Sequence, residues 1–226
     1  MRVINSLQGI VALRYSPDDT MPERTVLMRD LISFVGNAYK FSAMPQTPPG
    51  PVIDPVFSFQ SGELIVGDRK LAITSITLAV GGTIVAARNT DEADIILDDL
   101  VATLDTELGY RIRDNVKRRD YQSNIVVQFE PSLEDQISAL LRAERVLNRE
   151  IPRPNAPFKT KRLAFGFGDP VRPIRPFSLD DIPNSDFVIE RRAGEPYEDN
   201  RYLCAAPLRT SEHARVLELV EQAARG

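Results

Sequence analysis

Hydrophobic and polar positions along residues 57–88 follow the two-residue period of β-strands, and this pattern predicts an antiparallel β-meander. Three strands are expected, at about 57–66, 70–80 and 83–88. Gly67-Asp68 and Gly81-Gly82 separate them, and such pairs are typical of hairpin turns because these turns need positive φ. Neither face of the middle strand is strongly polar, so we expect this strand to be central and covered on both sides.

The stretch from Leu71 to Ala87 contains no charged residue, which raises the alternative of a membrane-spanning helix. It has only 17 residues, whereas a span needs about 20. It also carries four hydroxyl side chains and the Gly81-Gly82 pair. The pattern therefore favours a sheet, and no membrane association is expected.

Amphipathic stripes with the period of 3.6 residues predict four helices, at about 21–36, 90–108, 133–149 and 211–225. Thr20 and Glu23 have the spacing of a capping box at the start of the first. The second is expected to begin after Asn89 and to end at Gly109. In the third, five apolar side chains are expected to point inward: Leu133, Ile137, Leu140, Leu141 and Leu147.

Four further strands are expected, at about 123–129, 162–168, 187–192 and 202–208. The fold class is therefore α+β, with an antiparallel β-meander packed against amphipathic helices and followed by a smaller β-β-β-α unit; a mixed sheet remains an alternative. The proline-rich segment 43–55 is expected to be a loop or a polyproline II stretch, and residues 152–183 are also rich in proline but include the expected strand at 162–168. Residues 152–157 separate an expected main domain, 1–151, from a C-terminal subdomain, 158–226, or form a rigid elbow within one continuous domain.

The composition limits the kinds of site, the compartment and the partners that we expect. The chain has 226 residues, one Cys and one His, which excludes an intramolecular disulfide and disfavours His-rich metal sites. We expect a cytoplasmic protein without a signal peptide. The net charge of −4 argues against bulk binding of nucleic acid. Residues 1–109 contain 8 basic and 14 acidic side chains, and residues 110–226 contain 20 and 18, so the two parts could attract each other.

An acidic stripe is expected on the helix at 90–108, opposite its leucines. At 100° per residue its members fall within about 60° of one another: Asp91, Asp94, Asp98 and Asp105. Such a stripe is either a solvated face or a docking surface for a basic partner. A divalent cation is the least supported alternative, because the spacing matches no Gly-rich metal loop.

Two basic groups complement this stripe. The segment 110–121 contains Arg111, Arg113, Lys117, Arg118 and Arg119, and a run of this kind can bind phosphates or simply face water. A second group lies within about 60° on the helix at 133–149: Arg142, Arg145 and Arg149. Together with the acidic stripe, these are the candidate partner-binding residues.

Nucleophilic catalysis has little support. Cys204 lies in an expected buried strand and His213 in the first turn of the last helix, so a structural role is expected for both. No phosphate-binding glycine loop and no metal or hydrolase motif occurs, so we expect no catalytic residue, metal site or cofactor.

The sequence therefore favours a non-enzymatic cytosolic interaction protein: a subunit, adaptor or accessory factor that binds a protein partner or itself. The alternative is an enzyme that uses carboxylates with Arg or Lys on a phosphorylated or nucleic-acid substrate. Nucleic-acid binding without catalysis is a third, less favoured, class.

Overall fold

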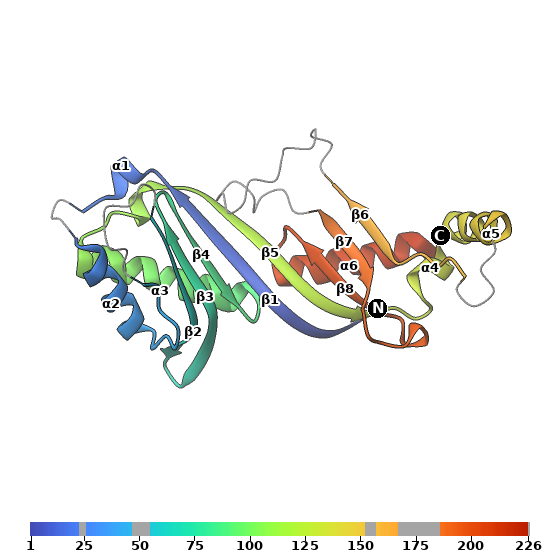
Figure 1. Cartoon of the computed structure of the whole chain (residues 1–226), viewed down its shortest axis with the longest axis horizontal. Helices are drawn as coiled ribbons and strands as arrows, with labels where there is room; N and C mark the ends of the chain where they lie inside the picture. Colours follow the sequence, from blue (N-terminus) through green and yellow to red (C-terminus); the bar gives the residue numbers. More distant parts are fainter. Residues whose placement is uncertain (23–25, 47–54, 152–156, 167–185, 226) are drawn as a thin grey trace.

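A computed structural model describes residues 1–22, 26–46, 55–151, 157–166 and 186–225. The eight strands found in these residues belong to one antiparallel sheet with the order β2-β3-β4-β1-β5-β8-β7-β6 (Figure 1). The strands are β1 (Arg2–Tyr15), β2 (Val56–Val66), β3 (Arg69–Ala79), β4 (Gly82–Ala87), β5 (Val116–Gln128), β6 (Arg162–Phe165), β7 (Phe187–Arg191) and β8 (Arg201–Ala206). The helices are α1 (Pro17–Thr20), α2 (Met28–Ala38), α3 (Thr90–Leu108), α4 (Leu133–Gln136), α5 (Ser138–Glu150) and α6 (Thr210–Arg225). The predicted α+β class, with a meander and a later β-β-β-α unit, is confirmed.

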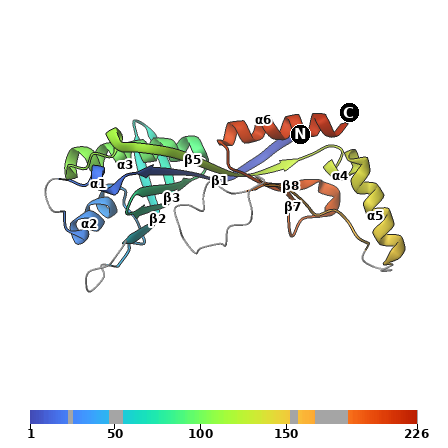
Figure 2. The same ribbon diagram turned by 90° about the horizontal axis from the view of Figure 1, so that it is seen from above.

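The two longest helices, α3 and α6, lie on the same side of the sheet (Figure 2). They begin next to each other and run in opposite directions. Their first residues exchange hydrogen bonds: the Thr90 N–H donates to Thr210 Oγ1 at 3.1 Å, and the Thr210 N–H donates to Thr90 Oγ1 at 2.8 Å. Each hydroxyl therefore satisfies one of the unpaired amides at the other helix's start.

Two groups of buried apolar side chains lie beneath these helices. The first fills the space between β1–β4, α2 and α3, and the second lies between β5, β7, β8 and α6. Strands β1 and β5 pair along most of their length and connect the two groups. The segments 1–151 and 158–226 thus share one sheet, because β8 of the second pairs with β5 of the first.

The β3–β4 hairpin accounts for the charge-free stretch, and the prediction of a sheet there is confirmed. The turn residues are Val80 and Gly81 rather than the expected Gly81 and Gly82, with Gly81 at φ 87° and Gly82 already in β4. The structure contains no helix, among the residues it describes, with the length and apolar character needed to cross a membrane.

The expectation that β3 is covered on both faces was wrong. Leu71 and Ile73 are buried, whereas Ala72 and Thr74 between them are exposed. A register shift against β4 after Ile73 then changes which positions face the helices, so Ile76 and Leu78 are the next buried pair. Only one face of this strand is covered by helices.

Two predicted helices differ from the structure. Thr20 was expected to cap a helix at 21–36, but it is the last residue of α1. Pro17 starts this short helix, and the Thr20 hydroxyl donates to the carbonyl of Ser16, the residue before the helix, at 2.8 Å. Helix α2 begins only at Met28. The helix predicted at 133–149 is divided into α4 and α5, because Ile137 adopts φ −100° and ψ 91°. The capping residue Glu23 lies outside the described residues.

The remaining predictions were closer. Helix α3 has the expected bounds, with the Asn89 side chain accepting the Glu92 N–H and Gly109 in the left-handed region. Strand β5 begins seven residues earlier than expected, at Val116, so much of the basic segment is part of the sheet. The later strands and α6 lie within about two residues of the predicted positions where they are described. The proline-rich residues 47–54, 152–156 and 167–183 lie outside the described residues.

Candidate functional site

The acidic stripe of α3 is only partly a surface. Asp91 is exposed, but Asp94 is buried and accepts two arginines: Arg119 Nη1 at 2.9 Å and Arg209 Nη1 at 3.0 Å. Burial raises the pKa of the Asp94 carboxyl, although both arginines act in the opposite direction. This carboxylate therefore joins α3 to β5 and to the loop before α6.

The other two members of the stripe also have partners within the chain. Asp98 accepts Arg119 Nη2 at 2.5 Å, while 61 % of its side-chain surface remains exposed. Asp105 accepts the backbone N–H groups of Ile112 and Arg113, at 2.8 and 3.2 Å. The structure thus brings part of the predicted acidic stripe together with part of the predicted basic segment.

Arg209 and Tyr121 complete this cluster and were not identified from the sequence. The Arg209 guanidinium lies 4.2 Å from the centre of the Tyr121 ring and donates to its hydroxyl. Tyr121 is in β5 and Arg209 precedes α6, so their separation of 88 residues leaves no local signal of the contact. The cluster connects α3 to the residue that precedes α6. The Asp94 carboxylate therefore has a structural role.

The remaining residues of the basic segment stay at the surface. Arg118 pairs with Asp120 at 2.6 Å and remains more than half exposed. The other three side chains are exposed: Arg111, Arg113 and Lys117. Among the described residues no set of three or more His, Cys, Asp and Glu side chains is arranged to hold a metal ion.

A second charged cluster, buried under α4, was also missed. Glu134 accepts Arg191 through two bonds, Nε to Oε1 at 2.7 Å and Nη2 to Oε2 at 3.2 Å, and both side chains are almost fully buried. Tyr202 and Tyr197 donate their hydroxyls to the same carboxylate. Desolvation by burial, with Glu134 adding to it, raises the pKa of Tyr197 to about 12, so this phenol remains a donor. The cluster fixes α4 on β7 and β8.

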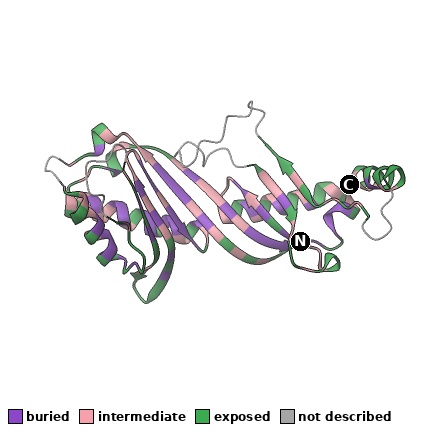
Figure 3. Ribbon diagram, in the orientation of Figure 1, coloured by how far each residue is buried: buried purple, intermediate pink, exposed green. Residues whose placement is uncertain are grey.

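Helix α5 carries the third predicted charged group and projects beyond the sheet (Figure 2). It packs mainly on α4, and most of its residues are exposed (Figure 3). Two of its side chains hold the segment that leads to β6. Glu144 Oε1 accepts the Thr160 N–H at 2.6 Å, and the Asn148 amide makes a pair of hydrogen bonds with the Phe158 backbone, at 2.6 and 3.0 Å.

The apolar residues of α5 that were expected to point inward do not all do so. Leu140 and Leu141 are half-buried, but Leu147 is 42 % exposed. Val146 and Ile151, both 48 % exposed, lie beside it. The break at Ile137 turns α5 away from the core, which explains why its apolar positions remain uncovered.

Arg142, Arg145 and Arg149 lie next to these apolar residues. Arg142 donates to Ser138 Oγ at 3.3 Å, and Arg149 pairs with the neighbouring Glu150 at 2.7 Å in a pair exposed at both ends. Arg145 has no ionic partner among the described residues. Exposed pairs of this kind contribute little to stability, so these guanidinium groups are free to meet another molecule.

Cys204 of β8 and His213 of α6 are both buried. Burial raises the pKa of the Cys204 thiol, which therefore stays protonated, whereas the thiolate is the nucleophilic form. Burial lowers the pKa of His213 to about 4, and its Nδ1 lies 2.9 Å from Ser123 Oγ. Its Nε2 has no hydrogen-bond partner among the described residues. The ring packs edge-on against Phe187.

No protein-family model and no curated protein matches this sequence.

Proposed function

We propose that this chain is a non-enzymatic interaction protein that binds an acidic protein partner through α5. The observation that carries the proposal is the exposed side of this helix, where apolar side chains lie next to three arginines. The partner surface that fits it is an apolar groove with carboxylates along one rim. Recognition of an amphipathic helix in a groove is a common mode of protein association.

The apolar side chains supply the attraction. Val146, Leu147 and Ile151 expose between 42 and 48 % of their surface. At 100° per residue the first two and Ala143 lie within about 100° of each other, and the centre of this group is about 130° from the centre of Glu144 and Asn148. Burying each of the larger side chains would stabilise a complex by roughly 1 kcal/mol or more.

The arginines supply the selectivity. Arg142, Arg145 and Arg149 lie along one flank of this apolar side, and guanidinium groups bind carboxylates with two parallel hydrogen bonds. A partner with carboxylates opposite this flank is favoured over one with arginine or lysine there.

A second copy of the chain fits this surface less well. In a two-fold antiparallel pair of α5 helices, each flank meets the same flank of the other copy, so the three arginines would face their own counterparts. Like charges at such short range oppose association. The partner is therefore a different protein.

Photo-crosslinking in the cells that make the protein tests this proposal. A benzoylphenylalanine placed at the exposed Ala143 should give one main adduct of higher mass. The adduct should disappear when Arg142, Arg145 and Arg149 are replaced together by Gln, and when Val146 and Leu147 are replaced together by Gln. The control variants Arg215→Gln and Leu219→Gln, both at exposed positions of α6, should retain it.

Sedimentation of the purified chain completes the test. A monomer at low and high salt, together with an adduct that depends on α5, supports the proposal. A concentration-dependent dimer that the Val146→Gln/Leu147→Gln variant abolishes would identify a second copy as the occupant. The proposal is contradicted if no adduct forms, or if the adducts are unchanged in both α5 variants.

A further inference from the structure

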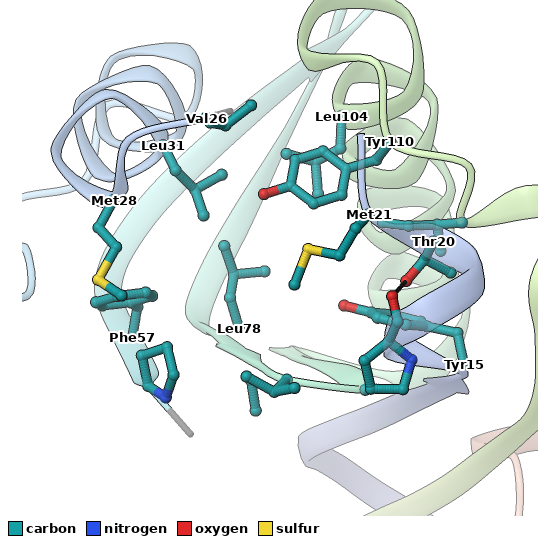
Figure 4. Close-up of a pocket in the computed structure, with 16 residues that line it drawn as sticks. Tyr15, Thr20, Met21, Val26, Met28, Leu31, Phe57, Leu78, Leu104 and Tyr110 are labelled. Carbon is teal, nitrogen blue, oxygen red and sulfur yellow. Dashed lines mark hydrogen bonds between the residues drawn. The ribbon is translucent and has the colours of Figure 1, made fainter. Parts of the chain in front are cut away.

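A cavity of about 190 Å³ opens at the end of the first apolar core (Figure 4). It lies between the start of α2, the end of α3, the short helix α1 and the β3–β4 turn. The buried residues of the first core adjoin it, and Tyr15, Met28, Leu31 and Tyr110 both pack against that core and line the cavity.

Among the residues that the structure describes, the lining is mainly apolar and contains no charged side chain. Leu31, Leu78 and the thioether of Met21 point into the space (Figure 4). An ionised ligand would lose its hydration here without gaining a counter-charge, which is strongly unfavourable. Methionine side chains are flexible and polarisable, and their sulfur makes favourable contacts with aromatic rings. The lining therefore favours an uncharged aromatic molecule.

Two phenol groups line the cavity, and their hydroxyls differ in whether they have a hydrogen-bond partner within the chain. The Tyr15 hydroxyl lies 3.1 Å from Thr83 Oγ1 and is therefore already paired. The Tyr110 hydroxyl points into the cavity (Figure 4) and makes no hydrogen bond to any described residue. Burial raises the pKa of Tyr110, so the group is protonated and available as a donor.

We propose that this cavity binds a small uncharged aromatic molecule that bears one hydrogen-bond acceptor, received by the Tyr110 hydroxyl. The volume fits this class, because an apolar cavity of about 150 Å³ accommodates benzene and ligands of drug size need at least about 300 Å³. One ring with a short substituent matches this volume. This binding does not involve α5, which lies at the other end of the molecule (Figure 1).

Fluorine NMR with two probes tests the proposal. The first probe is 4-fluoroacetophenone, whose ketone is an acceptor, and the second is fluorobenzene, which has none. Both should show saturable shifts or line broadening with the whole chain, and 4-fluorobenzoate, which is charged, should bind at least tenfold more weakly than the ketone.

Two variants locate the binding. Tyr110→Phe keeps the ring and removes the donor, so it should weaken the ketone roughly threefold to tenfold and change fluorobenzene less than twofold. Leu31→Trp fills the cavity and should weaken both probes at least tenfold. The matched control Leu219→Trp, at an exposed position of α6, should leave both unchanged.

The absence of saturable binding of either probe up to its solubility limit would overturn the proposal. Unchanged binding to a folded Leu31→Trp variant would do the same, and so would an equal loss of both probes in Tyr110→Phe. If circular dichroism shows that Leu31→Trp is unfolded, the difference between the two probes in Tyr110→Phe decides the matter.

Discussion

Arg119 and Asp94 form an ion pair at 2.9 Å that joins β5 to α3. The Asp94 side chain is nearly buried, and Arg209 approaches its other oxygen at 3.0 Å. Asp94 was a candidate for binding another molecule, but its carboxylate is bound by two arginines of its own chain. The packing of β5 and of the loop before α6 against α3 therefore decides which charged side chains remain free for a partner.

The Asp94–Arg119 pair should show a measurable coupling energy. In a double-mutant cycle with Asp94→Asn and Arg119→Gln, we expect about 1–3 kcal/mol of coupling, because removal of one partner leaves the other charge partly buried. Urea unfolding measures it. The exposed pair Arg149–Glu150 is the control, with at most about 0.5 kcal/mol expected. Equal coupling in the two cycles would show that the Asp94 cluster contributes no more than a surface pair.

Loss of Arg191 should destabilise the chain far more than loss of its neighbour. Arg191→Met leaves the Glu134 carboxylate buried without a counter-charge, which should lower the free energy of unfolding by roughly 3–5 kcal/mol. Arg192→Met removes a half-exposed pair with Glu195 and should cost less than about 1 kcal/mol. Thermal or urea unfolding distinguishes them, and similar losses for both would contradict the role given to the buried cluster.

The two hairpin glycines should respond differently to alanine. Gly67 has φ 58° and open space around a Cβ position, so Gly67→Ala should cost only the backbone strain, about 1 kcal/mol. At Gly81, with φ 87°, a Cβ would also lie 3.3 Å from Pro17 Cγ and from the Tyr15 carbonyl. We therefore expect a larger loss for Gly81→Ala. Urea unfolding of the two single variants compares them, and a smaller loss at Gly81 would be inconsistent with this geometry.

His213 should make stability depend on pH in a narrow range. Its pKa is about 4 in the folded chain and 6.5 when exposed, so the unfolded state binds more protons between these values. The free energy of unfolding should fall as the pH drops from about 6.5 towards 4, by up to about 3 kcal/mol, and His213 should contribute no slope above that range. The variant Ser123→Ala/His213→Leu, which replaces both hydrogen-bonding partners by apolar groups, should lack this part of the slope. Urea unfolding at several pH values measures the difference, and identical slopes would show that His213 is not buried as neutral imidazole.

Local interactions explain what the sequence by itself determined. The start and end of α3 depend on Asn89, which accepts an amide three residues later, and on Gly109, which tolerates the left-handed conformation. The Gly67-Asp68 turn and the strands of the meander likewise depend on neighbours in the chain. These features, with the α+β class that follows from them, could be predicted because their partners lie within a few residues.

Tertiary structure decided the features whose partners are far apart. Asp91 and Asp94 belong to the same predicted stripe, yet only Asp94 is buried, because β5 and the loop before α6 place Arg119 and Arg209 against it. Helix α5 leaves the core at Ile137, although its apolar spacing continues that of α4. The periodicity of a helix indicates which side chains share a face. It does not specify what covers that face, because burial depends on where distant strands and helices pack.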